Sequence, residues 1–277
     1  MELKTLLASQ FVLPSIPKVA ALLLSELDRA EPDLKKITQL ISTDPALTTR
    51  LLQLSNSGFF KMSGKVHSVS EALAILDLAH VRTMAVAAAS GASFKAVPGI
   101  NLQQFWNYSL NVAKLSRSLA GVVRQNQQAA FTCGLIHAVG ELAMHIGMGE
   151  AVEVLDREVP PLDLRRAKAE TWSFGFSYAQ VGAGLARQWH FPQPVIDALA
   201  HQDEPFERDA FEPLAGVIHL ATWRARAREA ELPDKALAVT FPGSVGDVLG
   251  LDIDMVLQQD PIDWSLQTPG RHFRTYL

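Results

Sequence analysis

The sequence predicts an all-α protein, and three observations lead to this prediction. Apolar residues recur at the spacing of one helical face along most of the chain, as in Val19, Leu22 and Leu23. Prolines and capping residues stand where such patterns begin, as at Asp44-Pro45. No sustained alternation of apolar and polar residues indicates a sheet. The 277 residues are 48% hydrophobic and 19% charged, a globular composition that can bury a substantial core.

The first hundred residues read as short helices separated by turns. Helices are expected over 17–29, 33–43, 45–57, 68–76 and 78–90. Ser68 and Glu71 have the spacing of a capping box at the start of the fourth helix. Residues 57–67 are expected to form a loop packed down by Phe59 and Phe60. The helical pattern breaks over 91–101, which is the best candidate boundary between two helical halves.

The second part contains longer helical patterns. Helices are expected over 102–120, 129–146, 149–157, 176–190, 193–201 and 211–230, with a more polar segment at 162–171 and a short helix near 252–259. Residues 129–146, AAFTCGLIHAVGELAMHI, are apolar almost all the way round. We therefore expect them to form the central buried helix of this part.

The bulk properties narrow the function classes. A net charge of −4 argues against a nucleic-acid-binding surface spread over the whole protein. Cys133 is the only cysteine, so no disulfide or cysteine metal site is expected and a reducing compartment fits best. The first residues lack the basic start and continuous apolar run of a signal peptide. The longest apolar runs, such as 84–90, are far shorter than the roughly 20 residues of a membrane span. We expect a cytoplasmic protein.

Three polar residues share one face of the central helix. His137, Glu141 and His145 are four residues apart, so the pattern is compatible with metal chelation or with a core histidine bonded to Glu141. We favour the core histidine, because metal sites usually need three or four converging ligands with supporting partners. His145 lies near the helix end and is expected at the surface.

Other polar and aromatic residues have simpler interpretations. The run His201-Gln202-Asp203-Glu204 is expected to be a polar helix end on a solvated face. Glu170 is expected to cap a backbone group or anchor a neighbouring helix. Two basic clusters are expected on solvated helix faces: Arg165, Arg166 and Lys168, and Arg224, Arg226 and Arg228. Four tryptophans are expected in the core or at its rim: Trp106, Trp172, Trp189 and Trp223.

Several segments, in order, resemble one known family. They are LPSIPKVAALLLSEL (13–27), ITQLISTDPALTTRLLQLSNSGFF (37–60), VHSVSEALAILDLAHVRTMAVAAA (66–89), FWNYSLNVA (105–113), AFTCGLIHAVGELAM (130–144) and ETWSFGFSYAQVGAGLARQWHFPQPVIDALAHQ (170–202). Over roughly residues 10–225 the chain resembles the HDOD family, the HD-related output domains of bacterial signalling proteins. The resemblance implies an N-terminal helical bundle, 1–100, packed on an HD-like helical half, 101–225. Residues 226–277 are expected to be a helical or irregular extension.

The HD-like half resembles metal-dependent phosphohydrolases, including the HD-GYP enzymes that degrade cyclic di-GMP. Those enzymes bind metal ions through histidines and aspartates, and the metal activates a water that attacks phosphorus. At the corresponding positions this chain has Tyr108, His137-Ala138, Tyr178, His201-Gln202 and Thr222. The enzymes have a histidine at the first and third of these positions. They have His-Asp at the second, His-His at the fourth and an aspartate at the fifth.

Only His137 and His201 therefore keep the ligand type of the enzymes. Tyrosine, alanine, glutamine and threonine cannot rebuild a site of imidazole and carboxylate ligands, so we expect neither a metal nor another cofactor. The resemblance then favours a non-catalytic signalling module with a protein partner in a bacterial pathway. One alternative is a residual phosphohydrolase that uses His137, Glu141 and His201. Another is a sensor that binds a nucleotide or metabolite in the vacated pocket.

Overall fold

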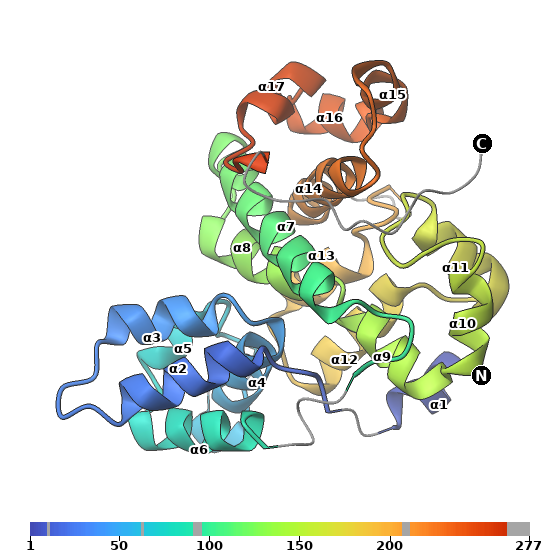
Figure 1. Cartoon of the computed structure of the whole chain (residues 1–277). Helices are drawn as coiled ribbons and strands as arrows, with labels where there is room; N and C mark the ends of the chain where they lie inside the picture. Colours follow the sequence, from blue (N-terminus) through green and yellow to red (C-terminus); the bar gives the residue numbers. More distant parts are fainter. Residues whose placement is uncertain (10–11, 62–63, 91–95, 207–210, 265–277) are drawn as a thin grey trace.

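The structure is a computed structural model that describes residues 1–9, 12–61, 64–90, 96–206 and 211–264. The described residues form helices joined by turns and contain no strand (Figure 1). The predicted all-α class is therefore confirmed. The chain folds into an N-terminal bundle packed on a larger helical part, and one continuous hydrophobic core runs through both.

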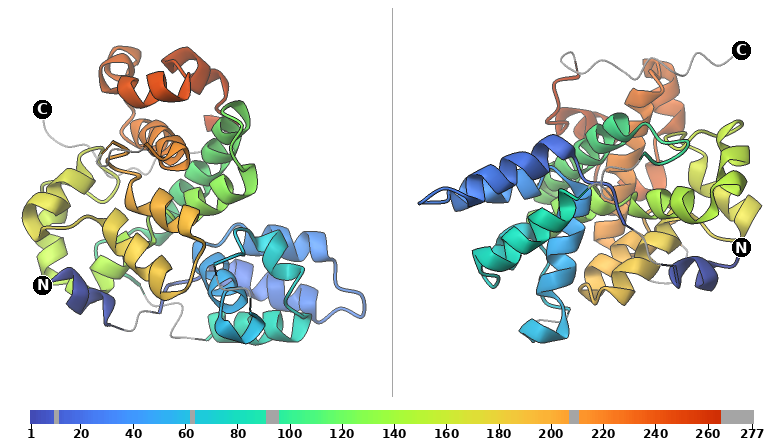
Figure 2. Two further views of the ribbon diagram at one scale, coloured as in Figure 1. Left: turned by 180° about the vertical axis from the view of Figure 1, so that it is seen from behind. Right: turned by 60° about the horizontal axis from the view of Figure 1, so that its bottom comes forward.

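The N-terminal bundle lies at one side of the molecule (Figures 1 and 2). It consists of α2 (Pro17–Leu27), α3 (Leu34–Ile41), α4 (Pro45–Ser55), the 3₁₀ turn η1 (Gly58–Phe60), α5 (Val69–Leu73) and α6 (Leu78–Ala88). The capping residues Asp33, Asp44, Ser68 and Asp77 each accept hydrogen bonds from the first turn of their helix. The bundle contacts the rest of the molecule through α4, which packs on α8.

The first helix, α1 (Leu3–Leu7), leaves this bundle and packs on the larger part (Figure 2). It contacts α9 and α12. The side-chain amide of Gln188 donates to the carbonyl of Leu7 across 3.1 Å. A Cβ at Gly184 would lie 2.6 Å from a methyl group of Leu7, so the Leu7 side chain would have to move to accommodate it.

The larger part also consists of helices joined by turns. Its elements are α7 (Leu102–Val122), α8 (Gln127–Ile136), α9 (Val139–Met148), α10 (Glu150–Asp156), α11 (Arg166–Phe174), α12 (Tyr178–Gln188), α13 (Gln193–Ala200) and α14 (Pro213–Glu229). Helix α7 packs along α8 and α14, and α12 packs along α9 and α13. Gly140 allows the close approach of α9 to α12, because a Cβ there would overlap the carbonyl oxygen of Tyr178.

The predicted central helix over 129–146 is divided in two. Helix α8 ends at Ile136 and α9 begins at Val139, with His137 and Ala138 between them. The prediction of one continuous helix was wrong, because a contact distant in sequence interrupts it. The side-chain amide of Gln202 donates to the carbonyl of His137 across 3.0 Å. This bond satisfies a carbonyl that a continuous helix would have used.

The same region is apolar enough to be compared with a membrane span. By length and composition alone, Gln127–Met148 could cross a membrane, but 89% of its most apolar window is buried inside the protein. This burial is typical of a core helix.

The C-terminal region covers one end of α14. It contains α15 (Asp234–Thr240), α16 (Gly243–Leu249) and α17 (Ile253–Gln258), and α16 packs on α14. The sequence predicted the last of these helices but not α1, α15 or α16. Trp223 of α14 donates its indole N–H to the hydroxyl of Thr240, which fixes α15 over α14.

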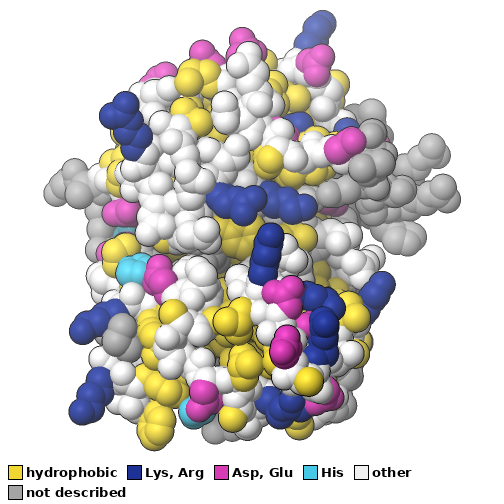
Figure 3. Space-filling view, turned by 90° about the vertical axis from the view of Figure 1, so that its left-hand side faces the viewer, with side chains coloured by type: hydrophobic (Ala, Val, Ile, Leu, Met, Phe, Trp, Pro, Cys, Tyr) yellow, Lys and Arg dark blue, Asp and Glu magenta, His cyan; other side chains and the backbone are white. Residues whose placement is uncertain are grey.

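One face of the molecule is drawn in Figure 3. Several Lys and Arg side chains lie together across the middle of this face, Asp and Glu side chains lie above and below them, and hydrophobic side chains gather mainly in the middle and lower half. No large area of a single charge is present on the described part of this face.

Candidate functional site

The residues that the resemblance matches to metal ligands converge on one buried place. Tyr108 comes from α7, His137 from the break between α8 and α9, and Tyr178 from the first position of α12. Gln202 follows α13, and its side-chain amide donates a hydrogen bond to the His137 carbonyl, which joins it to the group. Ala138 follows His137 and Thr222 lies on α14; both are buried. His201, also buried, lies beside Gln202.

His137 is held by two hydrogen bonds. Its Nδ1 lies 2.7 Å from the carbonyl oxygen of Gly134, so Nδ1 carries the proton. Its Nε2 lies 3.0 Å from the hydroxyl oxygen of Tyr108 and accepts a hydrogen bond from that hydroxyl. Burial lowers the pKa of His137 to about 3, and the charge of Arg226 acts in the same direction. His137 is therefore a neutral core histidine, and Glu141 is not its partner, contrary to one expectation from the sequence.

Arg226 of α14 completes the group. Its Nε donates to the Tyr108 hydroxyl across 3.0 Å. The guanidinium carbon lies 5.9 Å from the ring centre of Tyr108 and 5.2 Å from that of Tyr178. The side chain is only 4% exposed, so the prediction of a solvated position was wrong. Burial opposes its charge, but Tyr108, Tyr178 and Glu141 raise the pKa of Arg226, which stays cationic.

These bonds form a chain with one direction. Arg226 donates to Tyr108, Tyr108 donates to His137, and His137 donates to the Gly134 carbonyl. These three hydrogen bonds tie α14, α7 and α8 together in the core.

The residues present do not fit the metal centre of the related enzymes. Tyr108, Ala138, Tyr178, Gln202 and Thr222 supply neither an imidazole nor a carboxylate. Among the described residues no group of three or more His, Cys, Asp or Glu side chains is arranged to hold a metal ion. A permanent cation, Arg226, contacts Tyr108 and Tyr178, two of the matched positions.

A cleft opens beside Arg226 and has a volume of about 440 Å³. Its lining includes Arg165, Lys168, Tyr178, Gln202, Thr222 and Arg226. The Oε1 of Gln202 and the Oγ1 of Thr222 are buried and have no hydrogen-bond partner within the described part of the chain. His137 and Tyr108 do not line the cleft; Arg226 bonds to Tyr108 and also lines it.

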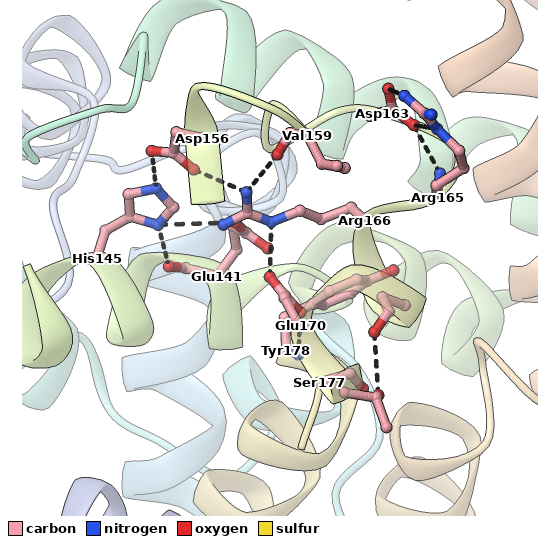
Figure 4. A network of polar contacts seen from close by, with 12 residues as sticks. Glu141, His145, Asp156, Val159, Asp163, Arg165, Arg166, Glu170, Ser177 and Tyr178 are labelled. Carbon is pink, nitrogen blue, oxygen red and sulfur yellow. Dashed lines mark hydrogen bonds and ion pairs between the residues drawn. The ribbon is translucent and has the colours of Figure 1, made fainter. Parts of the chain in front are cut away.

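A second polar cluster surrounds Arg166 (Figure 4). The fully buried guanidinium contacts Glu170 and Asp156 at 2.7 Å each and Glu141 at 2.8 Å, and it donates to the Val159 carbonyl. The prediction of a solvated Arg166 was wrong, because carboxylates from three other places in the sequence surround it.

Glu170 joins this cluster to the next helix. Its second oxygen accepts from the backbone N–H of Tyr178 across 2.7 Å, so it caps a backbone group as expected. Burial raises the pKa of Glu170, and the neighbouring Glu141 raises it further, against the opposing effects of Arg166 and the Tyr178 N–H. This cluster is an ion network in the core, and Glu170 connects it to Tyr178, the first residue of α12.

His145 is also buried, although a surface position was expected. Its two ring nitrogens lie 2.8 Å from the Glu141 carbonyl and 3.0 Å from a carboxylate oxygen of Asp156. Burial opposes its protonation, but Asp156 and Glu141 raise the pKa of His145. Helix α10 supplies Asp156 and covers this face of α9.

The remaining sequence expectations have mixed outcomes. His201 and Gln202 are buried, so a solvated helix end was the wrong interpretation for both. Trp106 and Trp223 are buried and Trp189 packs against the core, as expected. Trp172 is 93% exposed, so the expectation of a core position was wrong for it. Sequence reasoning missed the role of Arg226; the only available signal was its place one helical turn after Thr222.

Comparison with known proteins identifies the family to which this chain belongs. The HDOD domain family matches residues 13–205. A protein of Treponema pallidum is 26% identical over 229 residues, which are 80% of this chain and 44% of that protein. The chain thus spans less than half the length of this relative.

Two solved structures are similar over most of the chain. A fragment, residues 20–298, of the MmoQ response regulator of Methylococcus capsulatus has 26% identity and a TM-score of 0.69, and the match covers 88% of this chain and 94% of that one. A candidate phosphohydrolase of Shewanella amazonensis has 25% identity and a TM-score of 0.51, with coverage of 89% and 90%.

Proposed function

Since the chain belongs to the HDOD family, we propose that it is a non-catalytic module of bacterial signal transduction. It would act through contacts with a protein partner or a small ligand and would not hydrolyse a phosphodiester. The similarity to a response regulator supports a role in signalling.

One observation carries the proposal. The cationic side chain of Arg226 lies against the two tyrosines that stand at ligand positions of the related enzymes. A divalent metal ion in the same place would be repelled by this charge, most strongly because the site is buried. Without the metal, the enzymes' route to an activated water is lost.

The polar groups of the site already have structural roles. Both ring nitrogens of His137 are used, one on a carbonyl and one on Tyr108. The amide nitrogen of Gln202 holds the break between α8 and α9. Metal binding by His137 would require the loss of its bond to Tyr108, which in turn holds Arg226.

A residual phosphohydrolase is the alternative that one relative's name suggests. It would need Glu141 to replace the missing aspartate beside His137 and His201. Glu141 instead contacts Arg166 at 2.8 Å, inside the second polar cluster. This pairing favours the non-catalytic function.

The expected surroundings of the protein follow from the same features. Cys133 is a free, buried thiol, which fits a cytoplasmic location. The net charge of −4 and the mixed charges of the face in Figure 3 favour a protein partner over a nucleic acid.

A hydrolysis assay tests this proposal. Purified protein is incubated with cyclic di-GMP and with bis(p-nitrophenyl) phosphate in the presence of Mn²⁺, Fe²⁺ or Zn²⁺. We expect no turnover above that of a His137→Ala variant measured in parallel. Metal-dependent turnover that disappears in His137→Ala would contradict the proposal.

A further inference from the structure

Building on the proposed function, we infer that the cleft beside Arg226 binds a small phosphorylated molecule about the size of a mononucleotide. Such a ligand would give the module an input that needs no chemistry at the site. The inference comes from three features of the cleft, namely its charge, its unpaired polar atoms and its size.

The charge is supplied by Arg226 at the inner end of the cleft. Of its five N–H groups, only the one on Nε has an acceptor among the described residues, namely Tyr108. The terminal nitrogens keep their donors, and Arg226 lines the cleft. A guanidinium fixed between two rings can offer a bidentate pair of N–H groups, which matches the geometry of a phosphate. Lys168 adds an exposed positive charge at the rim.

Two side chains of the lining each carry a buried polar atom that has no hydrogen-bond partner among the described residues. Thr222 is 8% exposed and Gln202 is 2% exposed, yet Thr222 Oγ1 and Gln202 Oε1 make no hydrogen bond within the described part. Leaving such an atom unpaired is costly, so two unpaired atoms on side chains that line one cleft point to a missing partner. Thr222 lies one helical turn before Arg226, where its hydroxyl can join the guanidinium in binding a phosphate oxygen.

Gln202 further limits which chemical groups the ligand can carry. Its Oε1 can only accept a hydrogen bond, so the ligand must also carry an N–H or O–H donor. Asp203 and Glu204 line the cleft as well and add negative charge, which favours hydroxyl or amino groups over a second phosphate. A volume of about 440 Å³ is in the range of small-molecule sites and exceeds the needs of a single phosphate ion. A nucleoside monophosphate has these properties, because it joins one phosphate to sugar hydroxyls and a base.

Titration calorimetry at low salt tests the inference. The probes are AMP, GMP, CMP and UMP, with the four nucleosides and inorganic phosphate as comparisons. We expect at least one monophosphate to bind wild-type protein in a one-to-one ratio. Its nucleoside should bind at least about tenfold more weakly, because the charged hydrogen bonds to Arg226 are lost. Inorganic phosphate should also bind more weakly.

Variants locate the binding to the cleft. Arg226→Met and Thr222→Val should each weaken the bound monophosphate about tenfold or more. Arg187→Gln is the matched control, because it removes one exposed arginine from α12 outside the cleft. Thr222→Val is nearly isosteric, so it tests the site even if Arg226→Met does not fold.

Three outcomes would overturn the inference. They are the absence of monophosphate binding at millimolar concentration, equal binding of monophosphate and nucleoside, and unchanged binding in Thr222→Val. Equal binding of inorganic phosphate would overturn the proposed ligand size. Metal content and phosphodiester turnover of the same protein separate this result from the proposed function. Turnover would contradict the function and leave the binding result intact, and absent binding without turnover would contradict only the ligand site.

Discussion

The Nε of Arg226 donates to the hydroxyl of Tyr108 across 3.0 Å, and the two residues are 118 positions apart in the sequence. Through this bond α14 is joined to α7, and through Tyr108 and His137 it is joined to the end of α8. The group therefore has a structural role at positions that the resemblance matches to metal ligands of related enzymes.

Tyr108→Phe tests the hydrogen-bond chain. The substitution leaves His137 Nε2 without its donor and Arg226 Nε without its acceptor, both in the core. We expect the free energy of unfolding to fall by about 1–3 kcal/mol in urea denaturation. Tyr178→Phe is the control and should cost less, because within the described part of the chain the Tyr178 hydroxyl makes no hydrogen bond and its ring only packs near Arg226. Equal losses of unfolding free energy in the two variants would contradict a stabilising role for these hydrogen bonds.

His137 should remain neutral at all ordinary pH values. In the folded protein its pKa is about 3, whereas an unfolded histidine titrates near 6.5. The unfolded chain therefore binds more protons between these values, and stability falls as the pH is lowered from about 6.5 towards 3. At pH 5 the loss from this residue is about 2 kcal/mol. Unfolding of wild type and His137→Phe at pH 7 and pH 5 should show the difference, and NMR of the imidazole should show no titration above pH 5.

Arg166→Leu tests the second polar cluster. The change leaves Glu141, Glu170 and Asp156 close together in the core without their shared cation. We expect a loss of about 3–5 kcal/mol in the free energy of unfolding. Arg165→Leu is the matched control, because that side chain is 71% exposed and its ion pair should contribute less than about 1 kcal/mol. A similar small effect in both variants would show that Arg166 is not needed.

Gly140→Ala tests the approach of α9 to α12. A Cβ at this position would overlap the Tyr178 carbonyl and lie 2.7 Å from the backbone nitrogen of Gly182. Backbone cannot move aside as a side chain can, so we expect destabilisation of about 3 kcal/mol or more. Gly58→Ala, where no atom lies within 4 Å of the added group, should change stability little. Thermal unfolding of the two variants provides the comparison.

Much of this fold could be predicted from the sequence. Apolar spacing and caps such as Asp44 and Ser68 are local signals, and they located most helices correctly. Helices α1, α15 and α16 have seven residues or fewer, so their patterns are too short to be distinctive. The break at His137 was missed because the amide of Gln202, which stabilises it, is 65 positions away.

The site was predicted less completely. The convergence of Tyr108, His137 and Tyr178 around one place followed from the family resemblance. The burial of Arg166 and Arg226 could not be predicted from the resemblance or from the residues, because runs of arginine usually lie on solvated faces. Only the tertiary structure brings the tyrosines to one arginine and the carboxylates to the other.

Metal binding by the intact protein tests the central claim most directly. Purified protein is loaded with Mn²⁺ or Fe²⁺, separated from free metal and analysed for metal content, beside His137→Ala as the control. With Arg226 against Tyr108 and Tyr178, we predict no stoichiometric metal in either protein. Stoichiometric metal in wild type that is lost in His137→Ala would contradict the account.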